Sequence, residues 1–512
     1  MDATFDDVMT TRACISMATS VGSGCTPRFA SQCVGDADTA ASPSAPASCM
    51  TTTPTADLKQ LVGVTALLLD NAGSRGDTDV LPRSSEYRVL RGYSHQIARE
   101  VWSVEQEASV EIVEVPLSRL TARDVHSVDA YSFLRFGGAV LAMARLIEKH
   151  RAHPSVATAV RWAPNRSRCR LVEPGSFQRW DASLAQIEAS FPFVLELDMA
   201  LFFPSLAADV VHRALARWTP AGADLVNREL QRLRIRGLPV GGIPARLLGE
   251  AVLHDVDRAL LDAGRKHVRR MDDMTIGVRD EQDADAVRRL VAAVVRPHLH
   301  LSKSKARLRP SRSLGFPPQD PTHTVRQLLG DADPDRVRLG TALRELRDLI
   351  PAWETRRRVR WLRLLAAAVG QLPVSVGAVL RTLGRLVPGT PGLSPSDLEA
   401  VRNLLAAPVA LHRAQVALFL SRVDPAGAPI LARAARLDAS PLVRREALMG
   451  LVRLGARSEV AQLLKGQPET TADHPAWVIA SAVFGHASPL ADRTTYLKIL
   501  HRAAGEHRPH EV

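Results

Sequence analysis

The sequence predicts an α+β fold, in which a region of mixed strands and helices over residues 58–330 is followed by an all-helical region over residues 331–512. Apolar and polar residues alternate over 110–115 as in a half-buried strand, whereas apolar residues repeat at helical spacing over 131–150. After residue 331 strand signals nearly vanish. We therefore expect an interleaved α+β domain and a separate helical domain.

The first 57 residues are rich in Ser, Thr, Ala, Gly and Pro and show neither a helical nor a strand period. Such a segment buries too little apolar surface to offset the loss of chain entropy, so we expect it to be disordered. A tail that folds on binding is the alternative. Four of the five cysteines lie here without Cys-x-x-Cys spacing, which supports neither a zinc site nor a disulfide framework.

The chain of 512 residues carries a net charge of +12, from 66 Lys and Arg against 54 Asp and Glu. This excess favours a polyanionic partner such as RNA or DNA, although a solvated basic surface explains it equally well. No apolar run reaches the roughly 18 residues that span a bilayer. The sequence start also lacks a signal-peptide pattern. We therefore expect a cytoplasmic protein with no membrane partner.

Two strand-like runs in the mixed region lead into carboxylates. Residues 193–197 run into Asp198, and residues 267–278 enclose the adjacent pair Asp272 and Asp273 between apolar flanks. Read as a hairpin, the second run puts the pair at a tight turn, where an Asp pair alone often marks only an exposed turn or a helix cap. Three carboxylates at strand ends, however, are suited to holding two divalent cations.

Between these runs lies a loop rich in Gly and Pro, residues 236–242, which leads into a helical pattern with an apolar stripe. Glycines let a backbone approach a flat ligand, and a helix start offers free N–H groups to phosphates. Many structural turns precede helices in the same way. Further along, the strand-like residues 299–302 are followed by Lys303 and Lys305.

Taken in order, these segments resemble the palm of reverse transcriptases. The resemblance covers roughly residues 85–320 and implies a right-hand palm and fingers fold with RNA-directed DNA polymerase activity. Its segments are residues 113–123, which look like the fingers segment, residues 193–206 (motif A), 236–260 (motif B), 271–273 (the x-Asp-Asp of motif C) and 301–305 (motif D).

The resemblance implies a nucleotidyl transfer that depends on two Mg²⁺ ions, with Mn²⁺ as the alternative metal. Two such ions stabilise the attacking 3′-oxygen and the leaving pyrophosphate. Asp198 and Asp272 would bridge the ions with Asp273 in support, and Met199 would contribute only its backbone carbonyl. Lys305 would neutralise or protonate the pyrophosphate. A solvated surface lysine is the alternative reading, and Lys303 competes for the same role.

Nucleotide binding is implied for a second set of residues. Arg123 would bind the triphosphate, and Phe203, five residues after Asp198, stands where the family places the side chain that excludes a ribose 2′-hydroxyl. Because neighbours along a strand face opposite sides, we expect one of Phe202 and Phe203 to be an ordinary core aromatic. The loop would contribute Gly237, Pro239 and Gly241.

Some positions depart from the family pattern. Arg270 stands where an aromatic residue usually precedes the Asp pair, and a polar contact is lost at three further positions: Leu117 (usually Lys), Val240 (usually Gln) and Ala245 (usually Ser). The carboxylates themselves are retained. We therefore expect activity with altered handling of template or primer.

The last third of the chain predicts successive amphipathic helices over 336–349, 355–372 and 395–405. Residues 408–418 and, 33 residues later, 441–451 look alike, and residues 475–484 read as a third, degenerate copy. The second copy resembles a HEAT-repeat helix. We therefore expect HEAT-like stacking, with an irregular helical bundle as the alternative.

A palm followed by helical repeats resembles most the abortive-infection and defence-associated reverse transcriptases of bacteria. The implied function is a magnesium-dependent DNA polymerase in antiphage defence, with dNTPs and RNA or DNA as partners and a homo-oligomer left open. Some members make untemplated DNA primed by a protein hydroxyl. Tyr496, the sole tyrosine after the palm, is the first primer candidate, with a packed core tyrosine as the alternative. A retron-like enzyme using a dedicated RNA and a catalytically silent RNA- or protein-binding scaffold are the competing functions.

Overall fold

The computed structural model describes residues 57–72, 85–116, 122–158, 176–240, 242–302, 305–311, 320–330, 336–369, 376–386 and 395–512. By its internal contacts the chain divides into Met1–Thr52 and Thr53–Val512, and every described residue belongs to the second unit. The segment expected to be disordered lies outside the described residues except for Asp57. The five cysteines lie outside them too.

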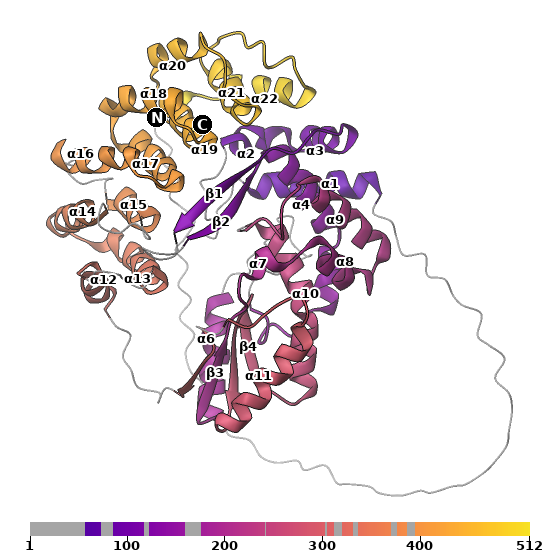
Figure 1. The fold of residues 1–512 in the computed structure, drawn as a ribbon. Helices are drawn as coiled ribbons and strands as arrows, with labels where there is room; N and C mark the ends of the chain where they lie inside the picture. Colours follow the sequence, from indigo (N-terminus) through magenta and orange to yellow (C-terminus); the bar gives the residue numbers. More distant parts are fainter. Residues whose placement is uncertain are drawn as a thin grey trace, which may run out of the picture. The chain divides into compact units, whose positions relative to one another are not determined.

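The described part of the chain is α+β, as the sequence predicts, and is mostly helical (Figure 1). Its first part combines helices with a two-stranded antiparallel ribbon: α1 (Leu58–Ala72), α2 (Ser85–Val89), α3 (Ser94–Ser103), β1 (Val110–Pro116), β2 (Ala122–Val128), α4 (Ala130–Ala142) and α5 (Ala144–His150). The single helix expected over 131–150 is therefore two. They bend by 44° at Met143.

A four-stranded antiparallel sheet follows, with the strand order β4-β5-β3-β6. Its elements and their neighbours are α6 (Ser176–Ser190), β3 (Phe193–Leu197), α7 (Phe202–Ser205), α8 (Ala208–Ala216), α9 (Pro220–Arg232), α10 (Ile243–Asp262), β4 (His267–Arg270), β5 (Asp273–Val278), α11 (Glu281–Val295) and β6 (Arg307–Pro310). Figure 1 shows α6 and α11 on opposite sides of the sheet. The strands are thereby buried on both faces.

Alternation along β3 explains the two faces of the sheet. Val194 packs with Ile187 of α6 in a small apolar cluster, whereas its neighbour Leu195 joins the main core together with Ile276 of β5. Successive side chains of a strand point to opposite faces, so a continuous apolar run is what a strand buried on both sides requires. The sheet is held firmly, and its strand ends are fixed in position.

The remaining described elements are helical, and all but the first follow residue 331, where helices were expected. They are α12 (Pro321–Leu329), α13 (Arg336–Leu349), α14 (Thr355–Val369), α15 (Val376–Leu386), α16 (Pro395–Asn403), α17 (Ala410–Val423), α18 (Ala428–Leu437), α19 (Pro441–Arg453), α20 (Arg457–Leu464), α21 (His474–Val483) and α22 (Thr495–Gly505). The two look-alike segments form α17 and α19, which pack against each other. The main apolar core contains residues from both predicted domains.

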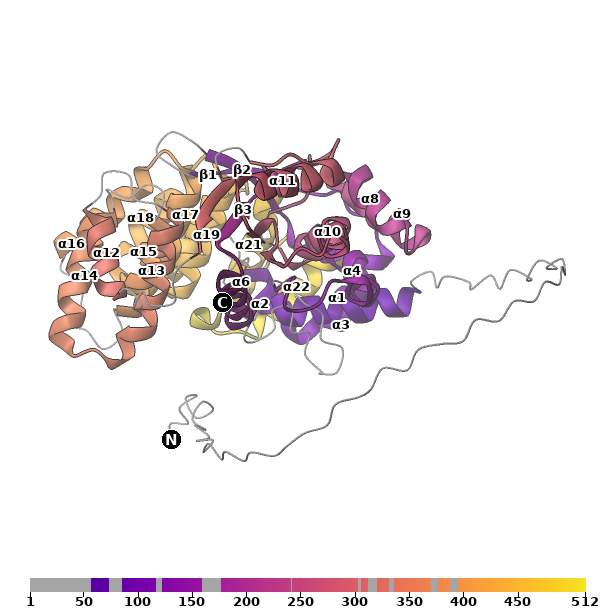
Figure 2. The ribbon, with the colours of Figure 1, turned by 90° about the horizontal axis from the view of Figure 1, so that it is seen from below.

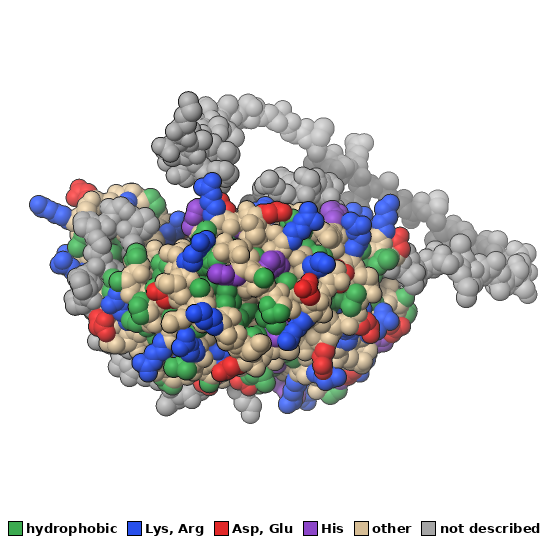
Figure 3. Space-filling model, turned by 90° about the horizontal axis from the view of Figure 1, so that it is seen from above, with side chains coloured by type: hydrophobic (Ala, Val, Ile, Leu, Met, Phe, Trp, Pro, Cys, Tyr) green, Lys and Arg blue, Asp and Glu red, His purple; other side chains and the backbone are tan. Residues whose placement is uncertain are grey.

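Two surface properties bear on partners. Within the described ranges, no single helix is long and apolar enough to cross a membrane, and only the bent pair α4 and α5 meets that test by length and composition. Lys and Arg side chains are spread over the face shown in Figure 3 and interspersed with Asp and Glu. On this face the positive charge is therefore distributed.

Candidate active site

A tight hairpin carries the Asp pair. Arg270 at the end of β4 pairs with Asp273 at the start of β5, so Met271 and Asp272 form the turn between them. Met271 has a φ of 58°, a left-handed conformation that costs of order 1 kcal/mol or more in a residue with a side chain. Its side chain is 8% exposed, and burial against the core holds this conformation. The hairpin thus presents Asp272 at its tip.

The third carboxylate lies beside the hairpin because β3 and β5 are neighbours in the sheet. Leu197 pairs with Met274, which places the next residue, Asp198, at the same edge as Asp273. The Asp198 side chain is buried, and its backbone carbonyl accepts a hydrogen bond from Ser302 N at 2.7 Å. Met199 is also buried, and its backbone forms an antiparallel bridge with Leu301.

Proximity and burial shift the titration of these groups. Burial and the charge of Asp198 raise the pKa of Asp272 to about 6. Burial, the charge of Asp272 and a hydrogen bond with Asp198 raise the pKa of Asp273 to about 7. Like charges held together at low solvent access disfavour ionisation in this way, and a bound cation relieves the repulsion.

The donor set fits magnesium by its chemistry, because Mg²⁺ is a hard cation that prefers carboxylate and carbonyl oxygens. Among the described residues, however, no group of three acidic, His or Cys side chains already has the arrangement of a metal shell. The carboxylates would therefore have to adjust around an ion. One of them already has a cationic partner.

That partner is Lys305, whose ammonium Nζ lies 2.9 Å from Oδ1 of Asp198. Burial would lower the pKa of Lys305, but the hydrogen bond and the charge of Asp198 outweigh it and raise the pKa. The side chain is 61% exposed, so it can follow a ligand. Lys303, which competes for the role in the sequence, lies outside the described residues.

Arg123 on β2 approaches the carboxylates from the ribbon. Burial lowers its pKa while the charge of Asp272 raises it, so its guanidinium lies within the field of that carboxylate. Its Nε is buried, with no hydrogen-bond partner in the described part of the chain. A buried donor without a partner costs about 1–3 kcal/mol, which an anionic ligand would offset.

The glycine-rich loop lies directly against the segment that follows Asp198. Gly237 has a φ of +78°, and a Cβ added there would lie 2.5 Å from Phe203 O. Leu238 N donates a hydrogen bond of 2.9 Å to the same carbonyl. Only glycine permits this approach. Pro239 is buried beside it, and Gly241 lies outside the described residues.

One of the two phenylalanines is a core aromatic, as expected, but both lie in the helical turn α7 and not in a strand, so strand alternation is not the reason. Phe202 is 3% exposed and belongs to the main core, whereas Phe203 is half-buried and packs on its margin. Their ring centroids are 5.2 Å apart in an edge-to-face arrangement. Phe202 is therefore the ordinary core aromatic, and Phe203 is the ring left to meet a ligand.

Sequence reasoning missed a buried ionic cluster that supports the hairpin. Arg269 of β4 is fully buried and donates hydrogen bonds of 2.7 Å to both Glu250 and Asp257 of α10. Glu250 also pairs with Arg151 at 3.2 Å. Removing one member of such a cluster leaves a buried charge without a partner, which costs about 3–5 kcal/mol. Charged residues within the apolar pattern of α10 were the only signal in the sequence.

Arg270, the departure noted beside the Asp pair, lies among other cations. Burial and the charges of Arg246 and Arg344 lower its pKa to about 10, against the opposing effect of Asp273. The guanidinium is half-buried. Positive charge is thus concentrated beside the carboxylates, where an aromatic ring is usual in the family it resembles.

Tyr496 is not brought to the carboxylates. Its side chain is 3% exposed, and its hydroxyl donates a hydrogen bond of 2.5 Å to Glu86 of α2. Burial and the charge of Glu86 raise its pKa well above the ordinary value. Its ring meets that of Tyr131 edge to face. The structure thus has Tyr496 as a packed core residue, the alternative to the primer role.

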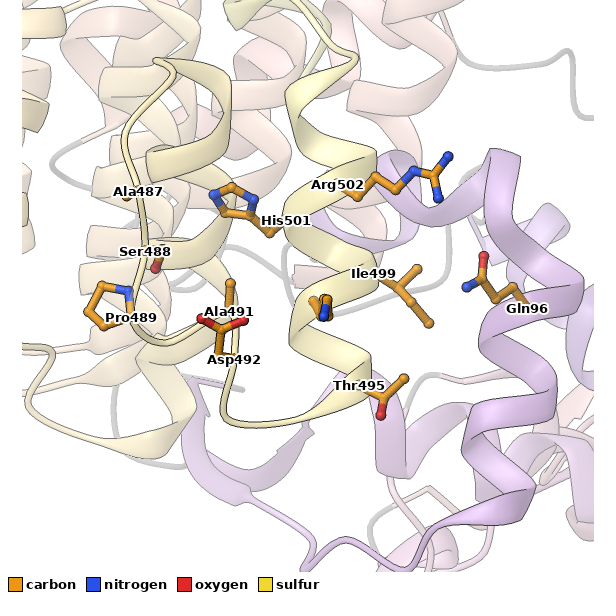
Figure 4. Close-up of a pocket in the computed structure, with 11 residues that line it drawn as sticks. Gln96, Ala487, Ser488, Pro489, Ala491, Asp492, Thr495, Ile499, His501 and Arg502 are labelled. Atoms are coloured by element: carbon orange, nitrogen blue, oxygen red, sulfur yellow. The ribbon is translucent and has the colours of Figure 1, made fainter.

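A hollow of about 710 Å³ lies elsewhere, between α3 and α22 (Figure 4). It is lined by Gln96 from α3 and by Lys498, His501 and Arg502 among others from α22. None of its lining residues is a predicted site residue. It is therefore separate from the carboxylates.

Comparison of the chain with models of known protein families and with curated proteins gave no match.

Proposed function

We propose that the protein is a magnesium-dependent nucleotidyltransferase of the reverse-transcriptase type, with a palm and fingers followed by HEAT-like helices. One observation carries the proposal: Asp198, Asp272 and Asp273 converge at one edge of an antiparallel sheet, where Lys305 pairs with Asp198 and Arg123 feels the charge of Asp272. Burial and mutual repulsion raise the pKa values of the two hairpin carboxylates, and a bound cation would relieve that repulsion.

The residues have distinct roles in this reaction. Asp198 and Asp272 would hold the ions, with Asp273 and the Met199 carbonyl in support, and the bound metal supplies the charge that activates the 3′-hydroxyl and stabilises the leaving pyrophosphate. Arg123 offers its unsatisfied Nε to the triphosphate. Lys305 shifts from Asp198 to the leaving group and can donate a proton there.

Selection of the sugar falls to Phe203. Its backbone carbonyl lies against Gly237 of the loop, and its side chain is half-buried, so a ribose 2′-hydroxyl in the space beside the ring would meet a rigid apolar edge. A deoxyribose fits without that contact. The substrates proposed are therefore dNTPs.

An arginine-rich helix supports a nucleic-acid partner. Arg356, Arg360 and Arg363 are exposed on α14, where positions three and four apart share a face. Arg357 lies over the ring of the buried Trp353 at 4.4 Å, which anchors the start of this helix. We propose RNA or DNA as the polymer bound here.

Defence against phage is the biological setting we propose, on the resemblance of the palm and the repeated helices α17 and α19 to those enzymes. Untemplated or protein-primed synthesis would need a primer other than Tyr496 in the conformation described. The competing functions are a retron-like enzyme and a catalytically silent scaffold, and the experiment below distinguishes them from the proposed one.

The test is incorporation of labelled dNTPs by the purified protein with Mg²⁺. Asp272→Asn should abolish it, and Asp262→Asn, an equal change of charge at an exposed position on α10, should leave it intact. Equal product from Asp272→Asn would overturn the site. Sequencing of copurified nucleic acid distinguishes a defined RNA–DNA hybrid, as from a retron-like enzyme, from protein-linked DNA of biased composition. Magnesium binding without any incorporation favours the scaffold.

A further inference from the structure

The ribbon that carries Arg123 has two strands only, and no third strand pairs with it in the described part of the chain. An isolated two-stranded ribbon is marginally stable in water unless one face packs on another element. The strands pair so that Val113 faces Val125 and Val115 faces Arg123. Directly paired residues share a face, so Arg123 lies on the apolar face of the ribbon.

That face is covered by the C-terminal helices. Val113, Val115 and Val125 form one buried cluster with residues of α17 and α19, namely Leu411, Ala414, Leu442 and Val443. Figures 1 and 2 both show the ribbon beside these helices. The opposite face carries Ile112, which is 65% exposed. The helices thus supply the core that the ribbon lacks.

A polar clamp fixes the end of the ribbon that lies away from Arg123. Glu111 Oε1 accepts hydrogen bonds from Ser440 Oγ at 2.7 Å and from Leu442 N at 3.3 Å. Arg445 pairs with Glu111 at 3.5 Å and donates to Ser127 Oγ on the second strand at 3.4 Å. Because Glu111 and Ser127 are paired residues, this clamp holds both strands to α19.

The glycine-rich loop joins this assembly through Val240, whose side chain packs against the ribbon cluster together with Val409 and Ala410. A polar residue is usual at this position in the family that the chain resembles. In this chain the apolar side chain of Val240 instead packs where the ribbon contacts the helices. The C-terminal helices therefore touch both elements to which nucleotide binding was assigned.

We propose that α17 and α19 complete the nucleotide side of the site, and that Glu111 is a positioning residue that sets Arg123 against the triphosphate. This inference rests on the proposed polymerase function. Glu111 lies four residues along the strand from Val115, the partner of Arg123, which is a distance of about 13 Å. Glu111 therefore acts on Arg123 through the ribbon and not by contact with substrate. The C-terminal helices would then contribute directly to nucleotide binding by the polymerase.

The test is a kinetic series in the full-length protein with variable dNTP. Glu111→Ala should raise KM for dNTP about tenfold, since it removes two hydrogen bonds to a charged group, and leave kcat within about twofold. Glu111→Gln keeps the Oε1 acceptor and loses only the ion pair, so KM should rise about twofold. Glu114→Ala, on the exposed face of the same strand, is the matched control.

A double-variant cycle distinguishes positioning from simple support. If Glu111 acts through Arg123, Glu111→Ala should add nothing to the KM of Arg123→Ala, whereas an unrelated loss of stability would add in full. Additive effects, or a Glu111→Ala protein that matches Glu114→Ala, would overturn the inference. Ser440→Ala, which removes one hydrogen bond, repeats the cycle if Glu111→Ala does not fold. Absence of incorporation by the wild type would instead overturn the proposed function, and this inference with it.

Discussion

The ammonium of Lys305 lies 2.9 Å from Oδ1 of Asp198, so a positive charge already rests on one of the carboxylates assigned to the metal. The same lysine is largely exposed, so in the proposed reaction it would be able to follow the pyrophosphate. An ion pair of this kind serves two states of a site. In the proposed reaction it would neutralise Asp198 before metal binds and would release a cation for the leaving group afterwards.

Replacing Lys305 by Met separates these two roles. Mg²⁺ affinity should rise a few-fold because the ammonium no longer competes for Asp198, while the rate of incorporation should fall about a hundredfold through loss of the proton donor. Magnesium titration and single-turnover kinetics measure the two effects. Lys465→Met, at an exposed position on another helix-end, is the control. Unchanged values of both quantities would remove Lys305 from the site.

The pH dependence of stability follows from the raised carboxyl pKa values. Asp272 has an ordinary pKa of 3.8 and a folded-state pKa of about 6, so between these values the folded protein binds more protons than the unfolded chain. The free energy of unfolding of the metal-free protein should therefore fall as pH rises from about 4 to about 7.

The loss should be of order 1 kcal/mol, because the Asp272 side chain is only half-buried and solvent screens part of the repulsion. Asp272→Asn should lose less stability than the wild type between pH 5 and pH 8 in denaturant titrations with EDTA, and Mg²⁺ should restore the wild type at pH 8. If the free energy of unfolding of the two proteins changed with pH in parallel, ionisation of Asp272 would not destabilise the folded protein.

Phe203→Ala should admit ribonucleotides. Removing the ring opens the space for a 2′-hydroxyl, and the preference for dNTP over rNTP, measured as a ratio of kcat/KM values, should fall at least about tenfold. Phe203→Tyr retains the ring and should keep the preference. An unchanged ratio in Phe203→Ala would assign this side chain to packing alone.

Tyr496→Phe should retain synthesis and lose stability. The change removes the hydroxyl that bonds to Glu86 and leaves a buried carboxylate without that donor, at a cost of about 1–3 kcal/mol in the free energy of unfolding. Denaturant titration and a dNTP incorporation assay measure the two effects. Loss of protein-linked DNA in a stably folded Tyr496→Phe protein would restore the primer role.

Local sequence patterns were enough to predict the elements that carry the carboxylates. The apolar run 193–197 is β3, and the helices expected over 336–349 and 355–372 are α13 and α14, the latter ending at Val369. Such patterns indicate which face of each element is buried, because apolar residues recur along that face at the spacing of a helix or a strand. The break at Met143 gave no such signal, because apolar spacing continues on both sides of it.

Contacts between distant parts of the chain could not be predicted in this way. Arg269 and Glu111 both lie in short strands, where a charged residue ordinarily indicates an exposed face. Their partners are a helix before the hairpin and a helix more than 300 residues later, as the separations of 19 and 329 residues show. Only the folded chain reveals that both charges are enclosed. Val240 likewise reads as a lost polar contact until its apolar neighbours are known.

The hydrogen bond between Tyr496 and Glu86 joins residues 410 positions apart. At roughly 5–20 residues per second, a ribosome needs about 20–80 s to synthesise the chain between them. Throughout that interval α2 and Tyr131 lack the partner against which they finally pack. Final closure of this core is therefore an event that follows synthesis, so the order of translation itself delays the appearance of the finished fold.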